Sequence, residues 1–375
     1  MVASKTSSKK LFIFSLSFLS FTTLGSCSNC SLQEGDNGGV KGMFVFGSSL
    51  VDNGNNNFFE NNAKADYLPY GIDFPNGPSG RFTNGKNLID LLGEHLKIPS
   101  FIPPFKDPST KGNKIVYGVN HASGSSGILD DTGLVAGNVT SLSEQIRDFE
   151  HVTLPDLESE LGCSRTDLLP RYLFVVGVGG NDIVFNYFLR GAFPRVDLRT
   201  FIADLITTLS KHLQKLYSFG ARKFVLTTIY PLGNSPMVKM NMANCGVCGR
   251  TLNQVTELYN SNLKVLVDRI EQQFPGSDFS IIHTYNIVMD ILSNAASKGF
   301  TDTQGSCCKV LPRNQGGNGL LCERRGQPCG DRSANVYYDA LHPTEAVNVQ
   351  IANEAFSSHD TSKIYPINVQ QLSQL

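Results

Sequence analysis

Short apolar runs alternate with longer segments of helical periodicity along most of the chain. The short runs are continuous and rich in β-branched or aromatic residues, as in strands buried on both faces. They are Met43–Phe46, Lys114–Val119, Tyr172–Val176, Phe224–Ile229 and Phe279–His283. The helical segments repeat apolar residues every three or four positions and run from Leu198 to Leu216, from Leu252 to Ile270 and from Ala346 to Phe356. Strand, helix and strand at this spacing predict an α/β fold with right-handed crossovers, in which helices cover both sides of a mostly parallel sheet.

A single domain is expected over residues 40–360, because no internal repeat and no linker divides the chain. Two segments rich in Asn, Gly, Pro or Cys, Asp52–Phe82 and Gly299–Arg332, are expected to form long loops on this domain. Long loops at the ends of a sheet are where substrate sites are usually built. Residues 361–375 are expected to form a C-terminal tail.

The first thirty residues have the pattern of a secretory signal peptide. Three lysines precede an apolar run over Leu11–Leu24, and small residues follow it. A membrane anchor is the alternative, but about fourteen apolar residues are fewer than the ~20 that a spanning helix needs. We therefore expect residues 1–28 to be removed and the mature protein to be secreted, without an integral membrane span.

Charge gives no indication of a nucleic-acid partner. The chain has 375 residues, with 32 Lys and Arg against 33 Asp and Glu and a formal charge of -1. It contains no block of like charge that would follow a phosphate backbone, so nucleic acid is not expected to bind.

Cysteines and a glycosylation motif fit an oxidising compartment. The Cys-x-x-Cys spacing of Cys245 and Cys248, with Cys307 and Cys308 downstream, also fits a zinc site. In a secreted chain such cysteines are more often disulfides, so we expect disulfides and no metal. Asn138-Val139-Thr140 lies in a polar stretch and predicts a surface glycan on Asn138.

Two adjacent serines, Ser48 and Ser49, are candidate nucleophiles. They follow a buried strand that ends at Phe46 and a glycine that is able to make a tight turn. A serine at the expected start of a helix here would point its hydroxyl out of the carboxyl end of the sheet, where ligands bind in open α/β folds. Unpaired N–H groups at the helix start would also favour a developing oxyanion. Taken alone, a serine in this place is more often an ordinary N-cap.

An Asp and a His three residues apart lie near the other end of the chain. Pro343 is suited to the first turn of a helix, which puts His342 where that helix begins. Asp339 is close enough in sequence for its carboxylate to accept from one imidazole nitrogen and fix the tautomer, as an acid does behind a general base. By itself the spacing also fits a capping histidine with a solvated aspartate.

Hydrogen-bond donors for an oxyanion are available in two further stretches. Gly179, Gly180 and Asn181 follow an expected strand, and Gly124 lies in a loop of small residues. An oxyanion hole needs N–H groups aimed at one point, which an Asn amide and a glycine N–H can supply. Each stretch alone also fits an ordinary turn.

Together, and in this order, the motifs resemble those of the plant-type GDSL esterase/lipases of the SGNH hydrolase superfamily. FVFGSSLVDNGNN is similar to the nucleophile block of that family, and SGRFTNGKNLIDLLGEHL to the segment that follows it. VNHASGSSGIL is similar to the glycine block, GGND to the asparagine block and YYDALHPTEAVN to the Asp/His block. The resemblance extends from about Met43 to the C-terminus.

The resemblance implies a three-layer αβα sandwich, flavodoxin-like in style, with a central and mostly parallel sheet. By motif, it implies Ser49 as the nucleophile, Asp339 and His342 as the rest of a triad, and Gly124 and Asn181 as oxyanion donors.

The chain departs from the pattern of that family at two positions. The family has Asp where this chain has Ser48, and we expect the residue there to brace the turn. It usually has an aromatic residue where this chain has His121, which we expect to be a packing or rim residue.

These residues predict a secreted carboxylic ester hydrolase without a metal or organic cofactor. Its substrate would be an ester of a lipid, an acylated small molecule or a polysaccharide, attacked by Ser49. One alternative is an acyltransferase that uses the same nucleophile. Another is a catalytically weak binding protein, which Ser48 suggests.

Overall fold

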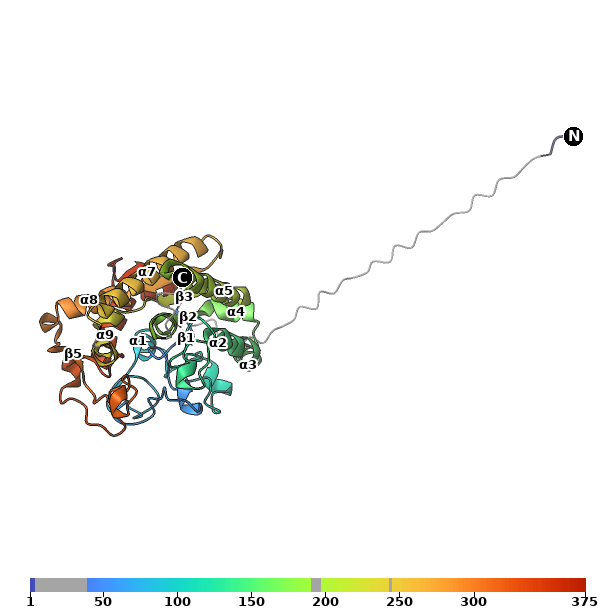
Figure 1. Cartoon of the computed structure of the whole chain (residues 1–375). Helices are drawn as coiled ribbons and strands as arrows, with labels where there is room; N and C mark the ends of the chain where they lie inside the picture. Colours follow the sequence, from blue (N-terminus) through green and yellow to red (C-terminus); the bar gives the residue numbers. More distant parts are fainter. Residues whose placement is uncertain (4–38, 190–196, 243–244) are drawn as a thin grey trace.

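A five-stranded sheet in the order β1-β2-β3-β4-β7 lies at the centre of the fold (Figure 1). The computed structural model describes residues 1–3, 39–189, 197–242 and 245–375, so almost all of the expected signal peptide lies outside the described residues. Four strands are parallel: β1 (Gly42–Gly47), β2 (Tyr172–Gly177), β3 (Lys223–Thr227) and β4 (Asp278–Ile282). The antiparallel strand β7 (Ile364–Pro366) pairs with β4.

Helices cover both faces of the sheet (Figure 1). Those of one face are α1 (Leu88–His95), α8 (Thr284–Ser293) and α9 (Glu345–Ser357). Those of the other face are α2 (Leu142–Asp148), α5 (Leu198–Phe219) and α7 (Cys248–Ile270). The shorter helices are α3 (Leu154–Leu161), α4 (Arg165–Leu168), α6 (Pro236–Asn241) and α10 (Val369–Gln374). The expected three-layer αβα fold with a mostly parallel sheet is confirmed.

Burial explains why the apolar runs and periodic segments form these elements. Every residue of β1 and of β2 is buried, as parallel strands between two helical layers must be. On α5, the buried positions recur every three or four residues, from Phe201 to Leu216, and the intervening positions are mostly polar. The strand ends are therefore fixed by the core, and the residues just after them face the loops.

One expected strand, Lys114–Val119, does not form. Residues 112–115 are a 3₁₀-helix, and the following segment runs beside β1 without regular pairing. Met43 N–H donates to Tyr117 O at 3.0 Å, and His121 N–H donates to Val45 O at 2.7 Å. Between them Gly118 has φ of +106°, and a Cβ there would lie 1.8 Å from Met43 O. The backbone thus protects the edge of β1 in a conformation open only to glycine at this point.

No α-helix begins at Ser49, contrary to the expectation. A single turn follows β1, then a 3₁₀-helix over Asn55–Phe58, and the first α-helix begins only at Leu88. The reason is that the asparagine side chains of this loop bond to distant carbonyl groups. Asn55 Nδ2 donates to both Asn120 O and Ala122 O, which ties the loop to the segment beside β1.

Residues 361–375 are not a tail outside the domain. They contain β7, which adds an edge to the sheet, and α10, whose Val369 and Leu372 are fully buried. The apolar residues Ile364, Val369 and Leu372 are too few and too widely spaced to give a periodic signal, so the sequence did not indicate these elements.

Three disulfides form in the described part of the chain, as expected. They are Cys245–Cys248, Cys307–Cys329 and Cys308–Cys322. The last two cross-link the Gly299–Arg332 loop beside a small parallel sheet of β5 (Asp302–Ser306) and β6 (Asn335–Tyr337). No group of three or more His, Cys, Asp or Glu suited to a metal occurs among the described residues.

His121 is a packing residue in the core. Its ring stacks between Phe46 and Phe105, with centroids 5.4 and 4.7 Å away, and Nε2 lies 3.1 Å from Thr153 Oγ1. Its Nδ1 has no hydrogen-bond partner in the described structure. Burial, with a smaller effect of Lys106, lowers the pKa of His121 to about 3.

We predict that His121→Phe makes the protein more resistant to acid. Between pH 3 and 6.5 the unfolded chain binds a proton at His121 that the folded chain excludes, so stability falls as the pH falls, by up to ~1.4 kcal/mol per pH unit. The variant lacks this loss. Its free energy of unfolding relative to that of the wild type should therefore be ~2 kcal/mol more favourable at pH 5 than at pH 8. Urea unfolding of both proteins at the two pH values measures the difference. If the two proteins differed in unfolding free energy by the same amount at both pH values, the assignment of a neutral, buried imidazole would be contradicted.

Candidate active site

Ser49 lies at the carboxyl end of β1, where the chain makes a tight turn. Gly47 has φ of +145°, and a Cβ there would lie 2.2 Å from Gly177 O of β2, so only glycine fits. The Gln145 side chain holds Gly47 with two hydrogen bonds. Gly47 N–H donates to Gln145 Oε1 at 2.7 Å, and Gln145 Nε2 donates to Gly47 O at 2.9 Å. Ser48 N–H donates to Gly177 O at 3.0 Å. These bonds direct Ser49 out of the sheet.

Ser48, unlike Ser49, has no hydrogen bond to His342 in the described part of the chain. It borders a small cavity of about 30 Å³ between the ends of β2 and β3, together with Gly177 and Thr227. The turn is therefore braced by Gln145 and not by the side chain at position 48, where we had expected the brace.

The structure brings together Ser49, His342 and Asp339, which are far apart in sequence. His342 Nε2 lies 2.8 Å from Ser49 Oγ, and His342 Nδ1 lies 2.7 Å from Asp339 Oδ2. The other oxygen, Asp339 Oδ1, accepts from Leu341 N–H at 2.8 Å and from His342 N–H at 2.6 Å. A neutral imidazole with its proton on Nδ1 leaves Nε2 free to accept the hydroxyl proton of Ser49.

Asn181 reaches the same place from the end of β2. Its Nδ2 donates to Ser126 O at 2.9 Å, which leaves its second N–H for another acceptor. The next residue, Asp182, is fully buried and accepts from Ile128 N–H, Leu129 N–H and Thr132 Oγ1. Burial raises the pKa of Asp182 to about 6, against these three donors. Asn181 and Asp182 therefore hold the Gly124-containing loop against β2.

The backbone N–H of Gly124 does not point in the expected direction. Its N–H donates to Asp52 Oδ2 at 3.0 Å, so this donor is directed at a carboxylate and not at Ser49. Asp52 Oδ1 accepts from Gly54 N–H and Asn55 N–H at 2.7 and 2.8 Å. Burial raises the pKa of Asp52 to about 6, although all three N–H groups and Arg81 lower it. The neighbour of Gly124, Ser125, borders the cavity at Ser49 and has φ of +68°.

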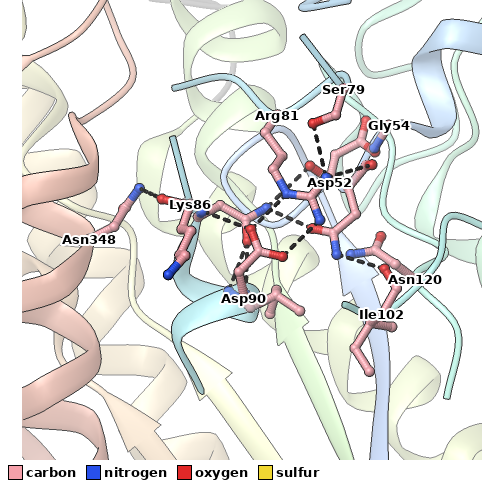
Figure 2. Close-up of polar contacts among 12 residues, drawn as sticks. Asp52, Gly54, Ser79, Arg81, Lys86, Asp90, Ile102, Asn120 and Asn348 are labelled. Carbon is pink, nitrogen blue, oxygen red and sulfur yellow. Dashed lines mark hydrogen bonds and ion pairs between the residues drawn. The ribbon is translucent and has the colours of Figure 1, made fainter. Parts of the chain in front are cut away.

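A buried ion pair fixes the loop that carries Asp52 (Figure 2). The Arg81 guanidinium binds Asp90 of α1 with two bonds, 2.6 Å from Nε to Oδ2 and 2.7 Å from Nη2 to Oδ1. Arg81 Nη1 also donates to Ser79 Oγ. With 5% of the Arg81 side chain and none of the Asp90 side chain exposed, losing either partner would leave an uncompensated charge. The pair therefore anchors the Asp52–Phe82 loop to the helical layer.

A cavity of about 620 Å³ opens over Ser49, His342 and Asn181. Its walls come from the two long loops, including Tyr67 and Phe82 from one and Leu311 and Leu321 from the other. These loops lie side by side, since Arg325 N–H donates to Leu68 O and Tyr67 Oη donates to Cys322 O. The lining combines apolar side chains with polar ones such as Asn61, Asn318 and Arg324. This composition suits an acyl chain and a polar group in one ligand.

The comparisons with known proteins agree with this geometry. The model of the GDSL-like lipase/acylhydrolase family matches residues 43–355. The chain belongs to this family. It is 39% identical over 338 residues to the GDSL esterase/lipase At1g29670 of Arabidopsis thaliana, with 89% of this chain and 91% of the relative covered. It is 40% identical over 345 residues to the GDSL esterase/lipase At1g71250 of the same plant, with 90% of each covered.

Membership of the GDSL lipase/acylhydrolase family makes the chain a carboxylic ester hydrolase, as its motifs predicted. Sequence reasoning missed three of the residues that support the site: Gln145, Asp52 and Tyr70. Tyr70 Oη donates to Asp339 Oδ2 across 269 positions. No spacing or periodicity connects residues so distant. The Asp-Asn-Gly of the nucleophile stretch was a signal for Asp52, because such an Asp often accepts from the backbone after it.

We predict that Asp52→Asn destabilises the fold by ~1–3 kcal/mol, because an amide NH₂ must then face a backbone N–H that has no other acceptor. The Gly124 loop should shift with it and lower kcat. Asp107→Asn is the matched control, since Asp107 Oδ1 accepts from Ser109 N–H at an exposed turn and an Asn oxygen can replace it. Denaturant unfolding that shows equal, small effects for both variants would contradict the scaffold role of Asp52.

Proposed function

We propose that this GDSL-family protein is a secreted serine esterase/lipase that hydrolyses carboxylic esters through an acyl-enzyme on Ser49. The observation that carries the proposal is the continuous line of contacts from Ser49 Oγ through the His342 imidazole to Asp339, at 2.8 and 2.7 Å. All three residues are at most 8% exposed, and Ser49 and His342 border a cavity large enough for an acyl group. This is the arrangement that an activated serine needs.

The first half of the reaction forms the acyl-enzyme. Ser49 Oγ attacks the ester carbonyl carbon while His342 Nε2 takes the hydroxyl proton. The resulting imidazolium is stabilised by Asp339 at Nδ1. When the tetrahedral intermediate collapses, the C–O bond to the alcohol breaks, and His342 gives its proton to the leaving oxygen.

The second half repeats these steps with water. Water gives its proton to His342 as it attacks the acyl carbon, and the proton then returns to Ser49 Oγ when the acid leaves. No step requires a metal or an organic cofactor.

The negative oxygen of each intermediate is held by the Ser49 N–H and the second amide N–H of Asn181. Gly124 supports this hole in a different way from the one expected. Its N–H ties the loop to Asp52, which positions Ser125 at the cavity. A Cβ on Gly124 would lie 2.6 Å from Phe82 Cζ, so the close packing of this loop also requires glycine.

An ester of a lipid, of an acylated small molecule or of a polysaccharide is the proposed substrate. The cavity supports all three, because apolar residues and polar residues share its lining. Secretion is supported by the N-terminal pattern and by the disulfides, which persist in oxidising compartments. Asn138 is exposed, as a glycan acceptor must be. Among the described residues, no helix has the length and apolar character that crossing a membrane would require.

There are two alternatives to hydrolysis: transfer of the acyl group to an alcohol, and ligand binding with little catalysis. An acyltransferase would use the same nucleophile and pass the acyl group to an alcohol, so products formed with a competing alcohol separate it from a hydrolase. A weak binding protein was suggested by Ser48. The Gln145 brace argues against it, because the turn at Ser49 is held without an acid at position 48.

We predict that Ser49→Ala reduces ester hydrolysis by ~10⁴-fold or more, because the nucleophile and its base act as one unit. Ser48→Ala is the matched control and should change kcat by no more than about tenfold, since His342 Nε2 is paired with the hydroxyl of Ser49 and not with that of Ser48. A serine-directed phosphonate should label Ser49 alone. Activity in Ser49→Ala with none in Ser48→Ala, or no phosphonate adduct on the native protein, would refute the proposed function.

We also predict that Asn181→Ala lowers kcat by ~10²–10³-fold, as the loss of one preorganised oxyanion donor does. Asn186→Ala provides the control, because Asn186 lies on the same helical segment and donates to Asp131 and Thr132 without bordering the cavity. Steady-state kinetics with a model ester distinguish the two. If the loss in Asn181→Ala appears only in KM, Asn181 binds substrate and does not stabilise the oxyanion.

A further inference from the structure

A buried tyrosine lies behind the acid of the proposed triad. Tyr70 Oη lies 2.6 Å from Asp339 Oδ2, the same oxygen that contacts His342 Nδ1. Tyr70 and Asp339 are both fully buried. The chain of contacts from Ser49 to His342 and Asp339 therefore continues to a fourth side chain, which comes from the Asp52–Phe82 loop.

The backbone of the other long loop fixes the direction of the tyrosine proton. Cys322 N–H donates to Tyr70 Oη at 3.0 Å. A backbone N–H can only donate, so the phenol oxygen accepts there and its own proton points to Asp339. Cys322 is held by its disulfide to Cys308 and by Tyr67 Oη, which donates to Cys322 O at 2.9 Å.

We propose that Tyr70 is a positioning residue that donates its hydroxyl proton to Asp339 and thereby sets the proton affinity of the Asp339–His342 pair. The inference rests on the proposed function and adds a residue to it. A carboxylate that is buried away from solvent needs hydrogen-bond donors to remain charged. A hydrogen bond from a neutral donor to a charged acceptor is stronger than one between two neutral groups. Tyr70 supplies that bond at Oδ2, the same oxygen that contacts His342 Nδ1.

Removing this donor should make the pair easier to protonate. The Tyr70 hydrogen bond stabilises the state in which Asp339 is negatively charged and His342 is neutral. When His342 is protonated, the imidazolium partly neutralises the carboxylate, and the hydrogen bond from Tyr70 becomes weaker. Without Tyr70 the charged carboxylate is less stable, so the proton binds at higher pH. Since His342 must be neutral to accept from Ser49, the acid limb of kcat/KM should move to higher pH.

The other ionisable groups around the pair are phenols and a few charged side chains. Three phenols face Asp339 besides Tyr70, and burial raises the pKa of each: Tyr67, Tyr230 and Tyr338. Burial and Asp339 also hold the pKa of Tyr70 well above its usual range, so Tyr70 remains a donor wherever the enzyme works. The charged groups beside these phenols are Arg324, over the Tyr67 ring, with Asp66, and the ion pair of Arg332 and Asp73 near Tyr338.

The test is the pH profile of kcat/KM for Tyr70→Phe on the full chain. We expect the midpoint of the acid limb to rise by ~0.5–1 pH unit and the plateau of kcat to fall by about tenfold, with KM within twofold. Tyr338→Phe is the matched control, because it removes a buried hydroxyl that donates to Pro69 O, next to Tyr70, and does not donate to Asp339. Its midpoint should equal that of the wild type.

A second variant keeps the test sharp if Tyr70→Phe does not fold. Site-specific replacement of Tyr70 by 3-fluorotyrosine keeps the ring and makes the phenol a stronger acid, so the midpoint should move to lower pH. A folded Tyr70→Phe variant with the midpoint of the wild type, or a fluorotyrosine protein without a shift, overturns the role of Tyr70. Such an outcome in an enzyme that hydrolyses esters leaves the proposed function standing. A wild-type chain without hydrolysis or phosphonate labelling contradicts both.

Discussion

The carboxylate of Asp339 is the group around which this site is organised. It is completely buried, and a buried charge is stable only if several donors surround it. The four that do so are the Leu341 N–H, the His342 N–H, the His342 ring and the Tyr70 hydroxyl. The hydroxyl is in turn oriented by the amide of Cys322 in the other long loop. Satisfying this one carboxylate therefore brings the two long loops into contact above the sheet.

The same physical solution recurs wherever irregular backbone is buried near Ser49. Asp52 gathers three N–H groups, Asp182 gathers two and a hydroxyl, and Gln145 both donates to and accepts from Gly47. The asparagine side chains of the Asp52–Phe82 loop donate in the same way to buried backbone carbonyl groups. Asn56 Nδ2, for example, donates to Ala63 O and Gly124 O. Side chains thus replace the missing strand and helix ladders, which is why a loop of Asn and Gly residues is buried.

The sequence predicted those features that depend on local patterns. Buried strands such as β2 and long helices such as α5 and α7 follow from apolar periodicity, because each buries one continuous surface against the sheet. The order of the motifs indicated the family. The residues 114–119 mimic a strand in composition, but Gly118 adopts a conformation that interrupts the pairing with β1. Composition cannot reveal that conformation.

The contribution of Tyr70 and the displaced N–H of Gly124 could not be predicted for a related reason. Both depend on which loop atoms meet, and the register of loops is set by buried polar contacts with no period in sequence. A motif specifies which residue types are present, whereas the direction of an N–H depends on its neighbours. Gly124 carries the expected residue type, yet its N–H is directed at Asp52.

The two long loops both line the cavity and hold the hydrogen bonds around Asp339. Tyr67 and Cys322 border the cavity, and both also hold the environment of Tyr70. A ligand that displaces the Cys308–Cys322 segment would therefore move the amide that orients the Tyr70 hydroxyl. Tyr70 in turn contacts the oxygen that binds His342. A change in the cavity wall that disturbed Tyr67 or Cys322 would consequently reach His342 as well, so the lining is constrained by the need to keep Asp339 fully hydrogen-bonded.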